Sequence, residues 1–225
     1  MARTQSPIKD ECVNSMLDRL HAQATRQLPG VVAHIAGQAV RMLVTRRPVD
    51  GDVGYYRDKL ISIDRRQGEL LYLLCRTAGA KRVVEYGTSF GVSTLYLASA
   101  VRDNGGGVVI GTELEPYKIQ TARENFEAAG VSSLIDLREG DALETLKDCG
   151  GPVDFLLIDG WPKLAASVVE LVAPQLRQGG IVVCDEAGHT PADKVAYRGF
   201  VRNPANGFVS LHVSFFRGTE ISIKN

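Results

Sequence analysis

The chain of 225 residues carries 26 basic and 26 acidic side chains, so its formal net charge is zero with histidine neutral. This balance excludes the broad electrostatic attraction to nucleic acid or to anionic membranes that a strongly basic protein has. With 44% hydrophobic residues, the chain is long enough for one compact α/β domain with a substantial core.

The cysteines and the first residues indicate the compartment. Cys12, Cys75, Cys149 and Cys184 show no Cys-x-x-Cys spacing, which predicts free thiols in a reducing environment. The N-terminal sequence lacks the apolar stretch of a signal peptide, and we expect no apolar run of membrane-spanning length. The prediction is a cytoplasmic protein whose partners include neither a membrane nor a nucleic acid.

Two helices are expected in the first sixty residues. Ser6-Pro7 is a helix-start signal, and the apolar positions after it form one face of a helix that ends near Pro29-Gly30. A second helix is predicted over 31–45, and a loop rich in Gly and Asp follows at 48–56. Because these helices precede the first strand, they are not crossovers of its βαβ units. We interpret residues 1–60 as a helical segment that caps the sheet, covers substrate or forms a homodimer through its apolar faces.

Helices and strands alternate from about residue 61 onward, and we expect residues 61–225 to form the second unit. Such alternation predicts a parallel sheet covered by helices on both faces, and two late strands without a helix between them predict a terminal hairpin. The fold class is therefore α/β: a Rossmann-like doubly wound sheet of seven strands, mostly parallel with an antiparallel C-terminal strand, preceded by N-terminal helices. The expected helices lie at 66–77, 93–101, 117–129, 143–146 and 164–176, and the expected strands at 82–86, 108–112, 135–138, 155–158, 181–184, 207–213 and 220–224.

A glycine turn follows the first of these strands. Residues 81–93 read Lys-Arg-Val-Val-Glu-Tyr-Gly-Thr-Ser-Phe-Gly-Val-Ser, so a strand with Glu85 near its end passes through Gly87 and Gly91 into a helix. Glycines at both positions let backbone N–H groups approach a ligand closely. The spacing differs from the dinucleotide fingerprint, which makes an NAD-binding dehydrogenase a weak alternative, and no Lys follows Gly91 as in a phosphate loop. A ligand with little net charge therefore fits this turn best.

Glu113 ends the second strand of the pattern. An acid at this place in a βαβ unit is positioned to accept two hydrogen bonds from a ribose diol. The alternative is that Glu113 or Glu115 only complements the dipole of the helix that opens at Pro116. The glycine turn before it favours the ribose.

Five segments carry a resemblance to a known family. They are VVEYGTSFGVSTLYLA (83–98), GTELEP (111–116), GDA (140–142), VDFLLIDGW (153–161) and GGIVVCDE (179–186). In this order they resemble the motifs of class I S-adenosylmethionine-dependent methyltransferases, and within that class the small O-methyltransferases related to catechol and caffeoyl-coenzyme A enzymes. Each motif alone is weak, but the ordered set is specific. The resemblance runs from about Ile61 to the C-terminus and is less clear over residues 1–60.

The resemblance implies S-adenosyl-L-methionine as cofactor, bound at the carboxyl ends of the strands where the strand order reverses. Gly87 and its neighbours would approach the methionine part, Ser93 would hydrogen-bond the carboxylate, and Glu113 would hold the ribose. Glu85 would order the glycine turn or reach the methionine amino group. The complete set of expected cofactor-binding residues is Ile63, Glu85, Gly87, Thr88, Ser89, Ser93, Glu113, Leu114, Gly140, Asp141, Ala142, Asp159 and Trp161.

The adenine has its own expected contacts. Asp141 would accept from the amino group while the backbone N–H of Ala142 faces a ring nitrogen. Leu114 and Trp161 would cover the two faces of the ring by stacking and dispersion. Ordinary core packing is the alternative for Trp161, the single Trp of the chain.

The resemblance implies methyl transfer to a hydroxyl of a small, aromatic acceptor. A phenol loses its proton only at about pH 10 in water, so a base or a divalent cation must assist near neutrality. In the related enzymes Mg²⁺ is held by three residues: Asp159 matches the first and Asp185 the second. The third position is Glu186, where the family pattern has Asn, and a third carboxylate changes the charge of the site. The alternative role for the adjacent acids Asp185 and Glu186 is to cap the turn or helix that follows them.

The base is displaced relative to the family pattern, which places a Lys three residues after the Asp. Here Pro162 occupies that position and Lys163 follows it. Proline is not a base, so Lys163 or His189 is the candidate, because the pKa of histidine suits neutral pH. The expected catalytic residues are thus Asp159, Lys163 and His189, with a surface position as the alternative for His189.

Glu186 and Pro162 leave two other functions open. One is a metal-independent N- or carboxyl-methyltransferase on the same fold. The other is a non-catalytic S-adenosylmethionine-binding protein that keeps the pocket but lacks the base. Loss of turnover in EDTA and its rescue by Mg²⁺ would separate a metal-assisted enzyme from both.

Overall fold

The computed structural model describes residues 6–46, 54–185, 191–214 and 218–225. Its strands are β1 (Arg82–Tyr86), β2 (Val108–Glu113), β3 (Ile135–Glu139), β4 (Val153–Ile158), β5 (Leu176–Asp185), β6 (Phe208–Val213) and β7 (Thr219–Lys224). They form one seven-stranded sheet in the order β3-β2-β1-β4-β5-β7-β6. β1 to β5 are parallel, and β7 is antiparallel to both of its neighbours, β5 and β6. The predicted fold class is confirmed.

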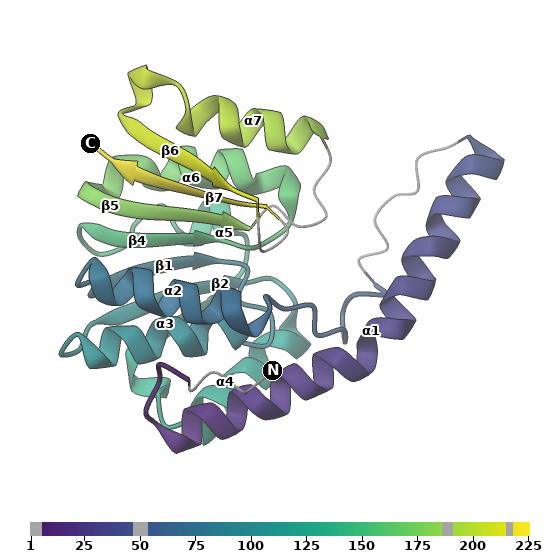
Figure 1. Ribbon diagram of the computed structural model, residues 1–225, viewed down its shortest axis with the longest axis horizontal. Coiled ribbons are helices and arrows are strands. Elements are labelled where there is room, and N and C mark those ends of the chain that lie inside the picture. The colour runs from purple at the N-terminus through teal and green to yellow at the C-terminus, as the bar shows by residue number, and fades with distance from the viewer. Residues whose placement is uncertain (1–5, 47–53, 186–190, 215–217) are drawn as a thin grey trace.

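Helices cover the sheet from both sides (Figure 1). The α-helices are α1 (Glu11–Thr45), α2 (Arg65–Thr77), α3 (Val92–Asp103), α4 (Pro116–Ala128), α5 (Ala142–Thr145), α6 (Ala165–Val172) and α7 (Pro191–Val201). Short 3-10 turns lie at η1 (Ser132–Leu134), η2 (Pro162–Leu164), η3 (Ala173–Gln175) and η4 (Pro204–Asn206). Buried side chains of α1 to α4 share one core with one face of the sheet, and those of α5 to α7 share a second core with the other face.

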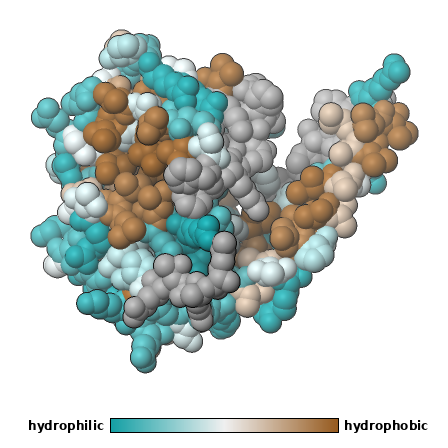
Figure 2. Space-filling view, viewed as in Figure 1, coloured by the Kyte–Doolittle hydropathy of each residue, from teal (hydrophilic) through white to brown (hydrophobic). Residues whose placement is uncertain are grey.

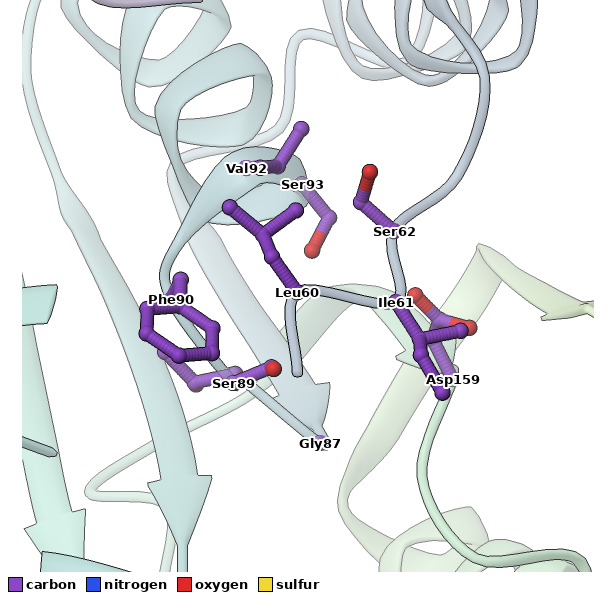
Figure 3. Close-up of a pocket in the computed structure, with 10 residues that line it drawn as sticks. Leu60, Ile61, Ser62, Gly87, Ser89, Phe90, Val92, Ser93 and Asp159 are labelled. Atoms are coloured by element: carbon purple, nitrogen blue, oxygen red, sulfur yellow. The ribbon is translucent and has the colours of Figure 1, made fainter. Parts of the chain in front are cut away.

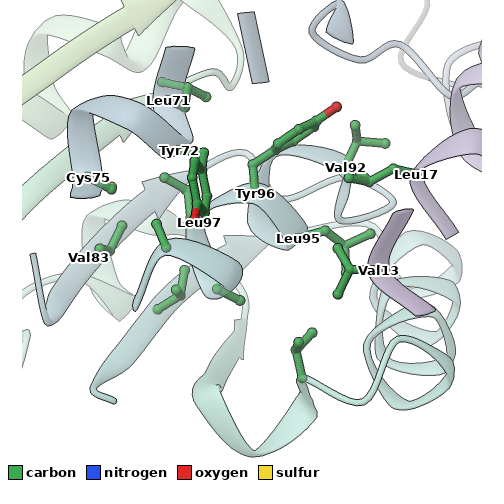
Figure 4. Close-up of a cluster of buried hydrophobic side chains, with 14 of the residues drawn as sticks. Val13, Leu17, Leu71, Tyr72, Cys75, Val83, Val92, Leu95, Tyr96 and Leu97 are labelled. Carbon is green, nitrogen blue, oxygen red and sulfur yellow. The ribbon is translucent and has the colours of Figure 1, made fainter. Parts of the chain in front are cut away.

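The first half of α1 belongs to the first of these cores. Figure 4 shows Val13 beside Leu95 and Leu17 beside Val92, so the first turns of α1 pack on α3. Complete burial of an aliphatic side chain stabilises a fold by about 1.5–3 kcal/mol. The N-terminal segment is therefore anchored through this half of the helix.

α1 is one continuous helix of 35 residues, so the predicted break near Pro29-Gly30 is wrong. Pro29 lacks an N–H and leaves the Thr25 carbonyl without its helical donor, which explains why α1 changes direction in its middle (Figure 1). The hydroxyl of Tyr55 donates to the Gly30 carbonyl at 2.9 Å. The hydrogen bond from Tyr55, which lies outside α1, thus supports the helix at the position where the local sequence predicts that it ends.

Two further predicted elements differ from the structure. α6 ends at Val172 and β5 begins at Leu176, whereas the pattern predicts a helix to 176 and a strand only from 181. The register between β4 and β5 is irregular, and two consecutive glycines there obscure the first half of the strand. α7 is absent from the expected elements, although its buried Tyr197 and Val201 have helical spacing.

Among the described residues, α1 is long and apolar enough to cross a membrane, judged by length and composition alone. The expectation that no run of this length exists is therefore wrong for α1. Very little of that apolar stretch is buried in the domain.

Candidate cofactor and catalytic site

A pocket opens at the carboxyl-terminal edge of the sheet, between the chain before α2 and the loop after β1 (Figure 3). It encloses about 280 Å³ including its open mouth. Its walls combine the predicted glycine turn, the start of α3 and the predicted Asp159. The lining residues are Leu60, Ile61, Ser62, Gly87, Thr88, Ser89, Phe90, Val92, Ser93 and Asp159.

The glycine turn is fixed by backbone conformation and by close packing. Gly87 and Gly91 have φ of 96° and 87°, a region that side chains other than glycine rarely adopt. A Cβ on Gly87 would lie 2.5 Å from the Cα of Gly160, in the loop after β4. Ser89 has φ of 51° without being glycine, so the turn stores strain at its tip. The loop after β1 therefore lies directly against the loop after β4.

Glu85 is fully buried below this turn. Its Oε2 accepts hydrogen bonds from the hydroxyls of Thr88 at 2.9 Å and Thr94 at 2.5 Å. Its Oε1 is buried without a hydrogen-bond partner among the described residues. Burial raises the pKa of Glu85, while hydroxyls of Ser93, Thr94 and Thr88 counter part of that rise. A buried oxygen without a donor costs free energy, so Oε1 is suited to a donor that a ligand brings.

Glu113 holds the glycine turn from the end of β2. Its Oε2 accepts from the backbone N–H of Ser89 at 2.8 Å, and its Oε1 accepts from the N–H groups of Leu114 and Glu115 at 2.8 and 2.9 Å. A carboxylate has about four lone-pair sites, so acceptor capacity remains for a ribose hydroxyl. The ribose role of Glu113 stays a prediction.

The expected adenine contacts lie at the ends of β3 and β4. Asp141 caps α5 by accepting from the N–H of Leu143 at 2.9 Å, and Ala142 is buried behind it. Gly140 donates its N–H to the Glu113 carbonyl at 3.0 Å, which ties this turn to the end of β2. These contacts fix the backbone, and the adenine roles remain predictions.

The two expected covers of the adenine are both solvent-accessible. Leu114 is 70% exposed and Trp161 is 51% exposed, so core packing does not account for Trp161. The hydroxyl of Tyr86 donates to the Trp161 carbonyl at 3.0 Å, and the ring of Tyr56 meets the indole edge-on at 6.0 Å between centroids. An exposed apolar pair at this edge is suited to a planar ligand.

Three further predicted cofactor residues are buried. Thr88 and Ser93 are buried beside Glu85 and line the pocket. The side chain of Ile63 is also buried and belongs to the core, so any contact of Ile63 with a cofactor would come from its backbone.

Asp159 and Asp185 lie side by side at the ends of neighbouring strands. Ile158 pairs with Cys184 in the register of β4 and β5, which places the next residue of each strand on the same face. Burial raises the pKa of Asp159 well above its usual range, and the nearby Asp185 and Glu85 raise it further. Asp159 and Asp185 also share a hydrogen bond. The structure therefore brings two of the three predicted metal ligands together.

The other predicted metal and catalytic residues are placed differently. Within the described ranges no group of three Asp, Glu, His or Cys side chains is arranged to hold a metal ion. Glu186 and His189 lie outside those ranges. Lys163 is described, lies in η2 and is exposed, and it is not among the residues that line the pocket.

Sequence reasoning missed several residues around the pocket. Leu60, Ile61 and Ser62 form one wall, although they lie in a loop without a periodic pattern. Thr94 follows the predicted Ser93 by one residue, and a helix start rich in hydroxyls beside a buried acid was a signal for it. The approach of Tyr56 to Trp161 joins distant segments and left no local signal.

The fold and the pocket define a class: an α/β domain with a glycine turn and acids at the carboxyl ends of its strands. Residues 84–187 match the family described as "Methyltransferase domain". Among solved structures, cofactor-bound Rv0187 from MTB superposes with a TM-score of 0.62 at 28% identity, covering 73% of this chain and 83% of that one. TomG from Streptomyces achromogenes, a structure in complex with SAM, gives a TM-score of 0.66 at 22% identity, covers 96% of this chain and 91% of that one, and shows the fold alone.

Curated relatives narrow the class to a family. A Mycolicibacterium vanbaalenii protein named "Putative O-methyltransferase" is 32% identical over 170 residues, which cover 72% of this chain and 70% of the relative. A catechol O-methyltransferase of Mycobacterium tuberculosis is 33% identical over 126 residues, or 56% of each chain. The chain thus spans just over half the length of that second relative. It belongs to the O-methyltransferase family.

Proposed function

We propose that this protein is an S-adenosylmethionine-dependent O-methyltransferase that methylates a hydroxyl of a small aromatic molecule, with assistance from a divalent cation. The observation that carries the proposal is the buried Oε1 of Glu85 beneath the glycine turn, which has no hydrogen-bond partner in the described part of the chain. Family membership supports the reaction class, and the polar strand ends support the cofactor.

The described residues fit the methyl donor. When bound, S-adenosylmethionine supplies a methyl group on an activated sulfonium, which requires alignment with the acceptor and little further activation. Oε1 of Glu85 would accept from the ammonium group, and Ser93 at the start of α3 would donate to the carboxylate. Glu113 would hold the ribose with its remaining acceptor capacity. Leu114 and Trp161 would enclose the adenine.

A divalent cation would have oxygen ligands at the pocket wall. Asp159 and Asp185 already adjoin each other at the strand ends, and a close pair of carboxylates is suited to Mg²⁺. Such an ion would bind the acceptor oxygen and favour its deprotonated form. Glu186 remains the proposed third ligand, and His189 or Lys163 the proposed base.

The acceptor would enter beside a set of partly exposed aromatic side chains. The ring of Tyr55 stacks on His34 at 3.5 Å between centroids, and Tyr56 meets Tyr55 edge-on at 5.1 Å. Tyr56 continues this set to Trp161. Aromatic walls favour planar acceptors, which supports a phenol or catechol.

The proposed setting is cytoplasmic and homodimeric. All four cysteines are free, and three of them are buried, as expected for a reducing compartment. Exposed apolar residues on the second half of α1 support pairing with a second chain. The division into a segment 1–60 and a domain 61–225 also stays a proposal.

The experiment is a methyl-transfer assay with isotopically labelled S-adenosylmethionine and a panel of phenols, catechols, amines and carboxylic acids. We expect label on a hydroxyl, no turnover in EDTA and recovery with Mg²⁺. Transfer to an amine or carboxylate that persists in EDTA would instead support the metal-independent alternative. Cofactor binding without any transfer would support the non-catalytic one.

A further inference from the structure

Within the described residues, one part of the sheet has no helix over it on the α1–α4 side. Figure 1 shows α2 and α3 in front of β1 and β2, while no described helix lies in front of β5, β7 and β6. Three side chains on that face are exposed: Val209 by 62%, Leu211 by 68% and Ile223 by 46%. Val209 and Ile223 are direct cross-strand partners, and Ile223 pairs onward with Ile181. We call Val209, Leu211 and Ile223 the sheet patch.

The second half of α1 is a helix whose apolar side chains pack against little of the described chain. Its apolar residues recur at alternating intervals of four and three, the 3.5-residue repeat of a helix that packs along a seam. The large members are 49–55% exposed. We call this set the α1 seam: Leu28, Val32, Ile35, Ala39 and Met42.

The two surfaces are placed so that a second copy can bring them together. In Figure 2 apolar side chains gather over β5, β7 and β6 on one side and along α1 on the other, and both surfaces face the viewer. Consider a two-fold axis that lies in the plane of this face and runs between the sheet patch and the α1 seam. Rotation about it places the α1 seam of one chain on the sheet patch of the other. The same rotation creates the reciprocal contact, so the assembly closes as a dimer.

The area is sufficient for a stable interface. With roughly 60 Å² of apolar area left on each large side chain of the two surfaces, the contact would bury about 400 Å² of apolar surface per protomer. Because interfaces are about 60% apolar, the whole contact would approach about 700 Å² per protomer, near the value of about 800 Å² for standard complexes. Helix-on-sheet packing would also complete the missing layer over β5–β7–β6.

We propose that the α1 seam of one chain docks on the sheet patch of a second copy, reciprocally. This inference rests on the homodimer included in the proposed function and specifies its interface. It differs from a dimer in which the two seams pair with each other as a coiled coil.

Site-specific cross-linking distinguishes these arrangements. In a Cys12→Ser background, which removes the exposed native thiol, chains with Ile35→Cys are co-expressed with tagged chains that carry Leu211→Cys. A short bis-maleimide is expected to link the two different chains. Cross-links between two copies of the Ile35→Cys variant expressed alone would overturn the proposal, and so would the absence of any cross-link between the two different chains.

Charge substitutions give a second readout. Ile35→Glu and Leu211→Glu should each shift the dimer to monomer in analytical ultracentrifugation, by at least tenfold in the dissociation constant. The control Val195→Glu, on α7 and 71% exposed, should remain dimeric. A monomeric wild-type protein, including one that floats with anionic phospholipid vesicles, would overturn the proposal, as would dimers in both variants. Adenosylhomocysteine binding, measured by calorimetry on Leu211→Glu, tests the cofactor site independently.

Discussion

The carboxylate of Glu113 accepts a hydrogen bond from the backbone N–H of Ser89 at 2.8 Å. The end of β2 therefore holds the loop that follows β1, at a residue with φ of 51°. A left-handed serine is strained, and the charged acceptor offsets part of that cost. The candidate ribose acceptor is thus also a structural support of the glycine turn.

We expect Glu113→Gln to weaken adenosylhomocysteine binding by at least tenfold, because hydrogen bonds to a charged group contribute about 1.5–3 kcal/mol. Calorimetry measures the affinity, and a thermal melt reports the support of the turn. Glu139→Gln is the matched control, since Glu139 is the exposed cross-strand partner of Glu113. Equal affinities for both variants would remove Glu113 from the site.

Two glycine substitutions separate packing from backbone strain. Gly87→Ala adds a Cβ at 2.5 Å from the Cα of Gly160, whereas Gly79→Ala meets nothing within 4 Å, and both residues have positive φ. We expect Gly79→Ala to lower the free energy of unfolding by about 1 kcal/mol and Gly87→Ala by about 3 kcal/mol or more. Urea denaturation measures both, and similar losses would show that contact with the loop after β4 contributes little.

His21 should make the fold sensitive to mild acid. Burial and the charge of Arg65 lower the pKa of His21 to about 4, against partial opposition from Asp64 and Asp18. In the unfolded chain the pKa of histidine is near 6.5. The contribution of neutral His21 to the free energy of unfolding is therefore fully present above about pH 6.5 and is lost as the pH falls toward 4. Because solvent screens the partly exposed imidazole, the free energy of unfolding should fall by about 1–2 kcal/mol.

The matched variant is His21→Gln, which retains a polar group for the Tyr96 hydroxyl, 3.2 Å from Nε2 of His21. Urea unfolding at pH 7 and pH 5 should show a smaller difference for the variant than for the wild type. The same pH dependence in both proteins would assign it to other groups.

Trp161 offers a direct optical signal because it is the single Trp of the chain. Its indole is 51% exposed, so an adenine stacked on it should quench the fluorescence and shift the emission to shorter wavelength. Trp161→Leu should weaken adenosylhomocysteine binding by about 1 kcal/mol, the contribution of an aromatic pair. Saturable binding in calorimetry without any change in emission would place the adenine elsewhere.

The strands of the sheet could be predicted from the sequence because each is marked by a local apolar run. Glu85, Glu113 and Asp159 each follow an apolar run, and strand ends in a parallel sheet meet at one edge. The predicted break near Pro29-Gly30 was wrong because the hydroxyl of Tyr55, 25 residues beyond Gly30, hydrogen-bonds the Gly30 carbonyl and supports the helix there. No local pattern contains such a contact.

The site was predictable to a similar extent. The adjacency of Asp159 and Asp185 follows from the order of neighbouring strands. The wall formed by Leu60, Ile61 and Ser62 depends on how an irregular segment crosses the pocket. Neither hydrophobic periodicity nor turn chemistry encodes that path, so it required the three-dimensional structure.

Glu85 provides the most direct test of the central claim that this pocket holds S-adenosylmethionine. The measurement is a calorimetric titration of adenosylhomocysteine into the wild type and Glu85→Gln, with folding of the variant checked by circular dichroism. We predict one-to-one binding to the wild type and a loss of at least tenfold in the variant, because the amide cannot provide a charged acceptor at both oxygen positions. No binding to the wild type, or equal affinity for both proteins, would contradict the account.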